Sequence, residues 1–143
     1  MVTLDEAKRR YPNAATFRFG DSEAICRELL DLVRAGAKRA TCEALSVYES
    51  GHDTMPEVGR RDIALDWSGR PALVIETTSI ETVAFNQVSE AFALAEGEND
   101  SLAGWRRVHQ DYFARSVGFS PDMLVVCERF DVVEVFDRSG SEF

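Results

Sequence analysis

The chain has 143 residues, of which 45% are hydrophobic and 29% charged, with a formal net charge of −9. A chain of this length usually forms one domain and buries enough apolar surface to fold without disulfides or metals. We therefore expect a single domain over residues 1–143. The composition excludes collagen, coiled coil and wholesale disorder. The acidic balance excludes bulk attraction to duplex DNA, which needs a basic face.

Membrane association and metal binding are not expected either. No window approaches about 18 uninterrupted apolar residues, so we predict no membrane-spanning helix and no membrane partner. The first twelve residues lack the apolar stretch of a secretory signal, which favours a cytoplasmic location. Cys26, Cys42 and Cys127 are widely spaced, with no Cys-x-x-Cys pair and no neighbouring histidine, so they predict free thiols. We accordingly expect no metal and no cofactor.

The first third of the chain predicts helix, strand, helix and strand in that order. Thr3 followed three residues later by Glu6 is a capping-box pattern, so a short helix should begin after Thr3. Residues 15–19 are β-prone. Residues 21–35 form an amphipathic helix with apolar side chains at helical spacing, and Gly36 ends it. The segment that follows Lys38 is predicted to be extended as far as Leu45.

The rest of the chain predicts a hairpin, two helices and terminal strands. Residues 62–67 and 71–78 are strands joined by a tight turn, and residues 79–85 either continue the second strand or bend away. Amphipathic helices are expected over residues 86–95 and 101–117. Strands at residues 123–127 and 132–136 precede a flexible polar tail at residues 137–143. This order predicts an α+β fold, with a mostly antiparallel sheet or small barrel and helices packed outside.

Two short segments carry candidate chemistry, and the first lies where a helix gives way to a strand. Gly36 allows a sharp turn there, which leaves Lys38 close to the start of the strand. A lysine shielded from water has a lowered pKa and can accept a proton from a hydroxyl such as that of Thr41. The alternative is a structural role, in which Lys38 with Arg34 and Arg39 counters the helix dipole.

The second candidate is the acidic segment over residues 95–100. It places Glu96, Glu98 and Asp100 at a helix end broken by Gly97. Carboxylates this close raise one another's pKa, which suits an acid or base residue. The alternative is that Glu96 and Glu98 are solvated while Asp100 or Ser101 caps the next helix.

Aromatic side chains offer further candidates for holding a base. Tyr48 lies just after a predicted strand and is hard to explain by packing alone. Trp105 could stack on a base, although its helical spacing with Tyr112 and Phe113 favours the core. His109, four residues after Trp105, is expected to be a packed or surface histidine rather than a catalyst.

Taken together, these segments resemble the ASCH domain family, a branch of the PUA-like superfamily of RNA-associated folds. The defining motif is Gly-x-Lys-x-x-Thr, here Gly36, Lys38 and Thr41. Other matching segments follow in the order of the bacterial single-domain branch, from about residue 11 to residue 136. They are residues 19–22 (FGDS), 56–59 (PEVG), 74–78 (VIETT), 95–100 (AEGEND), 105–109 (WRRVH) and 123–130 (MLVVCERF).

The resemblance implies a single PUA-like domain, a small mixed or antiparallel β-barrel flanked by helices, with a cleft beside the motif. Members of the family are linked to RNA binding, RNA cleavage and amide hydrolysis on acetylated cytidine nucleosides. In the amidohydrolase members, the lysine and threonine of the motif act with a glutamate of the acidic segment. These positions fall on Lys38, Thr41 and Glu98. The implied function is hydrolysis, either of single-stranded RNA or of acetylated cytidine.

Arg39, Tyr48 and Trp105 are the further residues expected to hold phosphate and base. The alternative function is a non-catalytic module that binds RNA or a modified nucleotide in RNA metabolism or regulation. Glu43 departs from the family pattern, which usually has Arg or a small polar residue there. A carboxylate at the cleft would repel phosphate, unless Glu43 points away or pairs with Arg39. The sequence leaves the oligomeric state open, a homodimer included.

Overall fold

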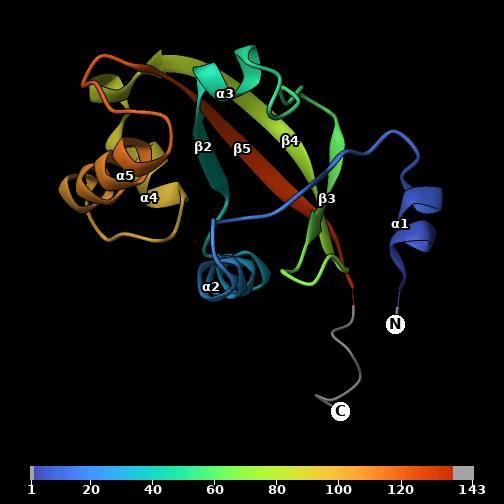
Figure 1. Cartoon of the computed structure of the whole chain (residues 1–143). Coiled ribbons are helices and arrows are strands. Elements are labelled where there is room, and N and C mark those ends of the chain that lie inside the picture. Colours follow the sequence, from blue (N-terminus) through green and yellow to red (C-terminus); the bar gives the residue numbers. More distant parts are fainter. Residues whose placement is uncertain (1, 137–143) are drawn as a thin grey trace.

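Two long antiparallel strands form the centre of a five-stranded sheet in the computed structural model, which describes residues 2–136 (Figure 1). These are β4 (Pro71–Ala84) and β5 (Leu124–Val135). β3 (Arg61–Leu65) pairs with β4, and β2 (Ala40–Ala44) pairs with β5, both antiparallel. β1 (Thr16–Phe17) adds a parallel edge to β3. The order is therefore β1-β3-β4-β5-β2, and the sheet is mixed.

The predicted α+β class is confirmed, but the sheet is open and twisted rather than a closed barrel. Closure requires the two edge strands to pair with each other. Within residues 2–136, β1 and β2 pair only with β3 and β5, at opposite ends of the strand order. β1 is only two residues long, too short to carry a closing ladder. Irregularities in the β4–β5 register, at Val74/Ile75 and Thr77/Ser79, bend the long hairpin instead.

The hairpin strands are longer than the local pattern predicts. β4 continues through the segment left open at residues 79–85, and β5 is one strand where two were predicted. Polar residues between 128 and 131 interrupt the apolar run in β5. The ladder nevertheless continues through them, because Arg129 and Glu128 pair with Ser79 and Ile80 of β4.

The helices begin where their capping residues predict. Thr3 forms both halves of the capping box with Glu6, and Ser101, not Asp100, caps the last helix. The predicted helix over residues 86–95 is instead a 3₁₀ turn followed by a shorter helix that Ser89 caps. The helices are α1 (Leu4–Arg10), α2 (Glu23–Arg34), α3 (Leu45–Glu49), η1 (Phe85–Gln87), α4 (Glu90–Ala95) and α5 (Leu102–Ser116).

Separate clusters of buried apolar side chains hold these helices on the sheet. α2 packs through Leu30 and Val33 in a cluster with Phe130 of β5. α4 and α5, which lie together in Figure 1, pack in another cluster that includes Trp105 and Phe113. No helix within residues 2–136 is long and apolar enough to cross a membrane. The tail predicted at residues 137–143 lies outside the described residues.

Candidate functional site

A cleft of about 710 Å³ opens among β1, α2, β2 and α5. Four of the six residues predicted from the sequence line it: Lys38, Thr41, Tyr48 and Glu98. They come from the α2–β2 turn, β2, α3 and the α4–α5 loop, so the fold brings together groups up to 60 residues apart.

Lys38 meets the acidic segment because two backbone turns cross closely. α2 and α4 each end in a glycine with positive φ, Gly36 at +81° and Gly97 at +75°. The Arg39 N–H donates to the Ala95 carbonyl at 2.8 Å, which ties one turn to the other. A Cβ built on Gly97 would lie only 2.3 Å from the Ala37 carbonyl oxygen. Only glycine fits at Gly97, both for its φ angle and for this approach.

We expect Gly97→Ala to destabilise the protein far more than the same change at Gly118. Both positions have positive φ, so each alanine carries about 1–2 kcal/mol of left-handed strain. Gly118 has open space around it, whereas Gly97 faces backbone that cannot move aside as a side chain can. The extra loss at Gly97 should be about 1–3 kcal/mol, measured by urea unfolding. Equal losses in the two variants would show that the turns separate without cost.

Lys38 is the buried centre of the site, with only 1% of its side chain exposed. Its Nζ lies 2.7 Å from Glu98 Oε2 and 3.3 Å from Glu96 Oε1, and it donates to the Ala40 carbonyl at 2.8 Å. Burial alone would lower the pKa of Lys38, but the two carboxylates outweigh burial and raise it above its ordinary value. Lys38 is therefore a fixed positive charge at neutral pH, not the base that a shielded lysine would be.

Glu96 is buried beside Lys38, and the alternative of a solvated Glu96 is wrong. Its side chain is 2% exposed, and its Oε2 accepts a 2.8 Å hydrogen bond from Trp105 Nε1. His109 Nε2 lies 3.5 Å from the same oxygen. Burial would raise the pKa of Glu96, but Lys38, His109 and Trp105 together lower it. Glu96 is thus held as a carboxylate inside the protein.

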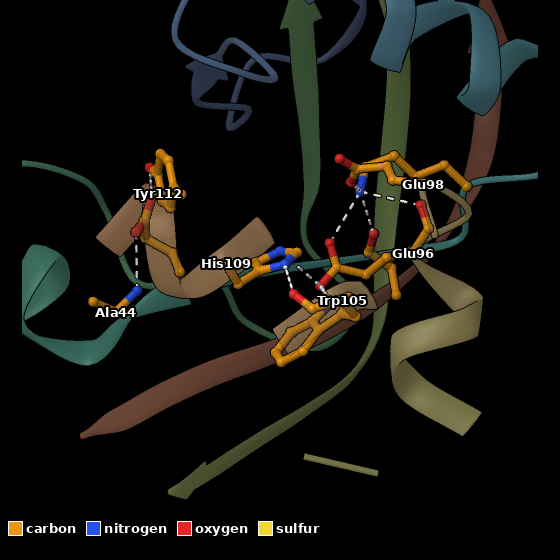
Figure 2. A network of polar contacts seen from close by, with 9 residues as sticks. Ala44, Glu96, Glu98, Trp105, His109 and Tyr112 are labelled. Carbon is orange, nitrogen blue, oxygen red and sulfur yellow. Dashed lines mark hydrogen bonds and ion pairs between the residues drawn. The ribbon is translucent and has the colours of Figure 1, made fainter. Parts of the chain in front are cut away.

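Trp105 lies in the core, as its helical spacing favoured, and has no exposed surface for stacking on a base. Its indole stacks between the rings of Phe85 (5.4 Å) and His109 (4.1 Å). Figure 2 shows Trp105 and His109 turned toward Glu96. The structure therefore places Trp105 as a support for Glu96 rather than on the cleft wall.

Arg39 also lies away from the cleft. Its guanidinium is more than half exposed and sits 3.6 Å from Asp131, and its Nε donates to the Gly36 carbonyl. Tyr48 does line the cleft, and burial together with Glu128 raises its pKa well above the ordinary value. The Tyr48 phenol is therefore neutral and available as a hydrogen-bond donor.

Glu43 and Glu128 are two of the five further carboxylates that line the cleft. Glu43 accepts from the Tyr112 hydroxyl and from the Ala44 N–H, both at 2.9 Å, so it does not pair with Arg39. Glu128 is the strand partner of Thr41 across β2 and β5 and accepts from Thr77 at 2.6 Å. Burial is the largest influence on both groups and raises the pKa of each.

Sequence reasoning missed Glu128 and undervalued Glu96 and His109. One signal for Glu128 was present, since it is an acid that directly follows the apolar strand predicted at residues 123–127. The signal for Glu96 was weaker, because the indole N–H of a buried tryptophan needs an acceptor. Within residues 2–136, no three His, Cys, Asp or Glu side chains come together as a group able to hold a metal ion.

Comparison with known proteins places this site within a family. The family model for the ASCH domain matches residues 15–134. The crystal structure of an ASCH domain from Lactobacillus crispatus JV V101 is 36% identical, with a TM-score of 0.78 over 93% of this chain and 87% of that one. A protein of Enterococcus faecalis V583 is 34% identical, with a TM-score of 0.77 over 92% and 85% of the two chains.

A more distant neighbour, ASCH from Zymomonas mobilis, shares the fold at 8% identity, with a TM-score of 0.53 over 85% of this chain and 71% of that one. None of the curated proteins matches the chain significantly. The family match covers most of the chain and includes the Gly36, Lys38 and Thr41 motif at the cleft. The chain therefore belongs to the ASCH domain family, with its PUA-like α+β fold.

Proposed function

We propose that this protein is an RNA- or nucleoside-directed hydrolase that works through Lys38, Thr41 and Glu98. The observation that carries the proposal is the buried Lys38 ammonium, 2.7 Å from Glu98 in a cleft that Thr41 also lines. A buried charge of this kind, with a perturbed pKa and inside a concave site, is typical of functional rather than structural residues. Membership of an RNA-associated family supports the same class of substrate.

The three residues take different roles. Lys38 remains charged, so it stabilises negative charge that develops on the substrate, as oxyanion-directed groups do. Glu98 is the accessible carboxylate of the pair, with 23% of its side chain exposed against 2% for Glu96, so it carries the proton. Thr41 supplies the nucleophilic hydroxyl or positions the attacking water.

Deacetylation of an acetylated cytidine is the better supported of the two reactions. Single-stranded RNA would bring several phosphates to a cleft lined by seven carboxylates, Glu43 and Glu128 among them, against three arginines and Lys38. The arginine expected to neutralise Glu43, Arg39, is bound to Asp131 instead. A nucleoside has no phosphate to repel, and its polar groups match donors and acceptors such as the Tyr48 hydroxyl.

The proposal is tested by incubating the purified protein with acetylated cytidine and, separately, with end-labelled single-stranded RNA. We expect release of cytidine, and its loss in Thr41→Val. Thr54→Val is the matched control, because Thr54 also lines the cleft but is exposed and assigned no role. No turnover of either substrate would contradict the proposal. Full activity in Thr41→Val would remove Thr41 from the mechanism.

A non-catalytic binding module is the second candidate. The observation favouring it is that the Lys38 ammonium already has hydrogen-bond partners within the protein, namely Ala40, Glu96 and Glu98. Titration calorimetry with the same nucleoside separates the two candidates. Tight binding without turnover would favour the module, and turnover would exclude it.

A further inference from the structure

His109 occupies a defined position beside the buried acid of the site. It lies one helical turn after Trp105 on α5, is 8% exposed, and stacks on the Trp105 ring at 4.1 Å with 21° between the planes. Its Nδ1 is 2.9 Å from the Trp105 carbonyl oxygen, and its Nε2 is 3.5 Å from Glu96 Oε2. Figure 2 draws the two contacts of the ring as dashed lines, one to Trp105 and one to Glu96.

These two contacts determine where the ring hydrogens are. A carbonyl oxygen only accepts, so Nδ1 must carry a hydrogen. In the neutral ring Nε2 would then present a lone pair to a carboxylate oxygen, placing two acceptors face to face. The arrangement is favourable only when a proton lies between Nε2 and Glu96. Glu96 already accepts from Trp105 and adjoins the Lys38 ammonium, so that proton belongs on the imidazole.

We infer that His109 is a positioning residue of the cleft, an imidazolium at neutral pH that holds Glu96 ionised and fixed beside Lys38. The cluster then contains two cations, Lys38 and His109, and two anions, Glu96 and Glu98. This balance stabilises four charges in a largely buried place. With a neutral His109 the same cluster would carry an uncompensated negative charge, which burial opposes.

The groups facing His109 agree with this assignment. Glu96 and Glu98 approach from the α4–α5 loop, and Glu43 acts on it from β2. The Tyr112 hydroxyl on α5, bonded to Glu43, stays neutral because burial raises its pKa. Burial of the ring lowers the pKa of His109, but Glu96 and the Trp105 carbonyl outweigh burial and raise it above the ordinary value near 6.5.

The raised pKa of His109 determines how the stability of the protein changes with pH. A group whose folded pKa is raised contributes stability that is fully present below its unfolded pKa and is lost as pH rises through the folded value. The wild type should therefore lose stability, relative to His109→Gln, as pH rises from about 6.5. Glutamine keeps an amide donor for Glu96 but does not titrate, so its stability should not follow this trend.

The direct test is an NMR titration of the unmodified protein with ¹⁵N-labelled histidine. The chain contains two histidines, so the spectra hold one further set of ring signals, that of the exposed His52. We expect His109 to titrate above the ordinary histidine pKa of about 6.5, with both ring nitrogens protonated at pH 7. In Glu96→Gln the pKa of His109 should fall, because burial then acts without the carboxylate.

A His109 ring that has lost its proton by pH 7 in the wild type would overturn the inference without any variant having to fold. The catalytic consequence rests on the proposed function. His109→Gln should lower kcat for the cytidine substrate by roughly tenfold or more, because a displaced catalytic group is costly. His52→Gln should leave kcat for this substrate unchanged. Unchanged kcat in an active His109→Gln would overturn the positioning role. If neither substrate is turned over, the proposed function fails, and the titration still decides the state of His109.

Discussion

Lys38→Met is expected to lower the free energy of unfolding by about 3–5 kcal/mol at pH 7, since breaking a buried ion pair leaves its partner charge unpaired. Methionine has a similar length but no charge. Glu96, 2% exposed, would then keep Trp105 and His109 as its side-chain partners among the described residues. The Ala40 carbonyl would also lose its 2.8 Å hydrogen bond.

Urea unfolding at several pH values measures this effect. The lowered pKa of Glu96 means that its pairing contributes stability above its ordinary pKa, near 4.5, and that this stability is lost as pH falls through the folded value. The difference in unfolding free energy between Lys38→Met and the wild type should therefore become smaller in acid. The double variant Lys38→Met/Glu96→Gln should recover part of the loss, because the buried Glu96 carboxylate that Lys38 neutralises is then absent too.

Lys8→Met is the matched control, since Lys8 is the only other lysine and is exposed on α1. We expect it to change stability by no more than about 0.5 kcal/mol. A Lys38→Met variant as stable as the wild type at pH 7 would show that Glu96 does not depend on Lys38. If the difference in unfolding free energy did not depend on pH, the lost stability would come from packing and not from charge.

Glu98→Gln is expected to lower turnover of acetylated cytidine by about 10²–10⁴-fold, the usual contribution of a general acid or base. The glutamine carbonyl can still accept from Lys38, and the side chain is partly exposed, so the fold should survive. Steady-state rates of cytidine release measure the effect. Asp100→Asn is the control, because it removes an exposed carboxylate of the same loop that does not line the cleft.

The pH dependence of the same reaction distinguishes the roles of Glu98 and Lys38. Because the pKa of Lys38 is raised, the rate should not climb between pH 7 and 9. A steady climb over that range, lost in Lys38→Arg, would instead identify the amine as the base. Activity retained in Glu98→Gln would show that Glu98 does not transfer the proton.

The sequence by itself determined those features that depend on near neighbours. Capping by Thr3 and Ser101 and the glycine that ends α2 involve groups within about one turn of each other, so local patterns predict them. The family motif likewise places Lys38 and Thr41 at the start of β2. Their presence at one cleft with Glu98 was predicted through the resemblance rather than from spacing.

The tertiary structure decided which of these groups are buried, charged and paired. Lys38 and Glu96 are 58 residues apart, and no periodicity within α4 distinguishes a solvated Glu96 from one enclosed by Trp105 and His109. The same holds for Glu43, whose partner Tyr112 lies 69 residues away on α5. Whether the sheet closes depends on pairing between distant edge strands, which local propensity does not record. A buried charge takes its protonation state from the groups packed around it, and only the docking of α4 and α5 on the sheet brings those groups together.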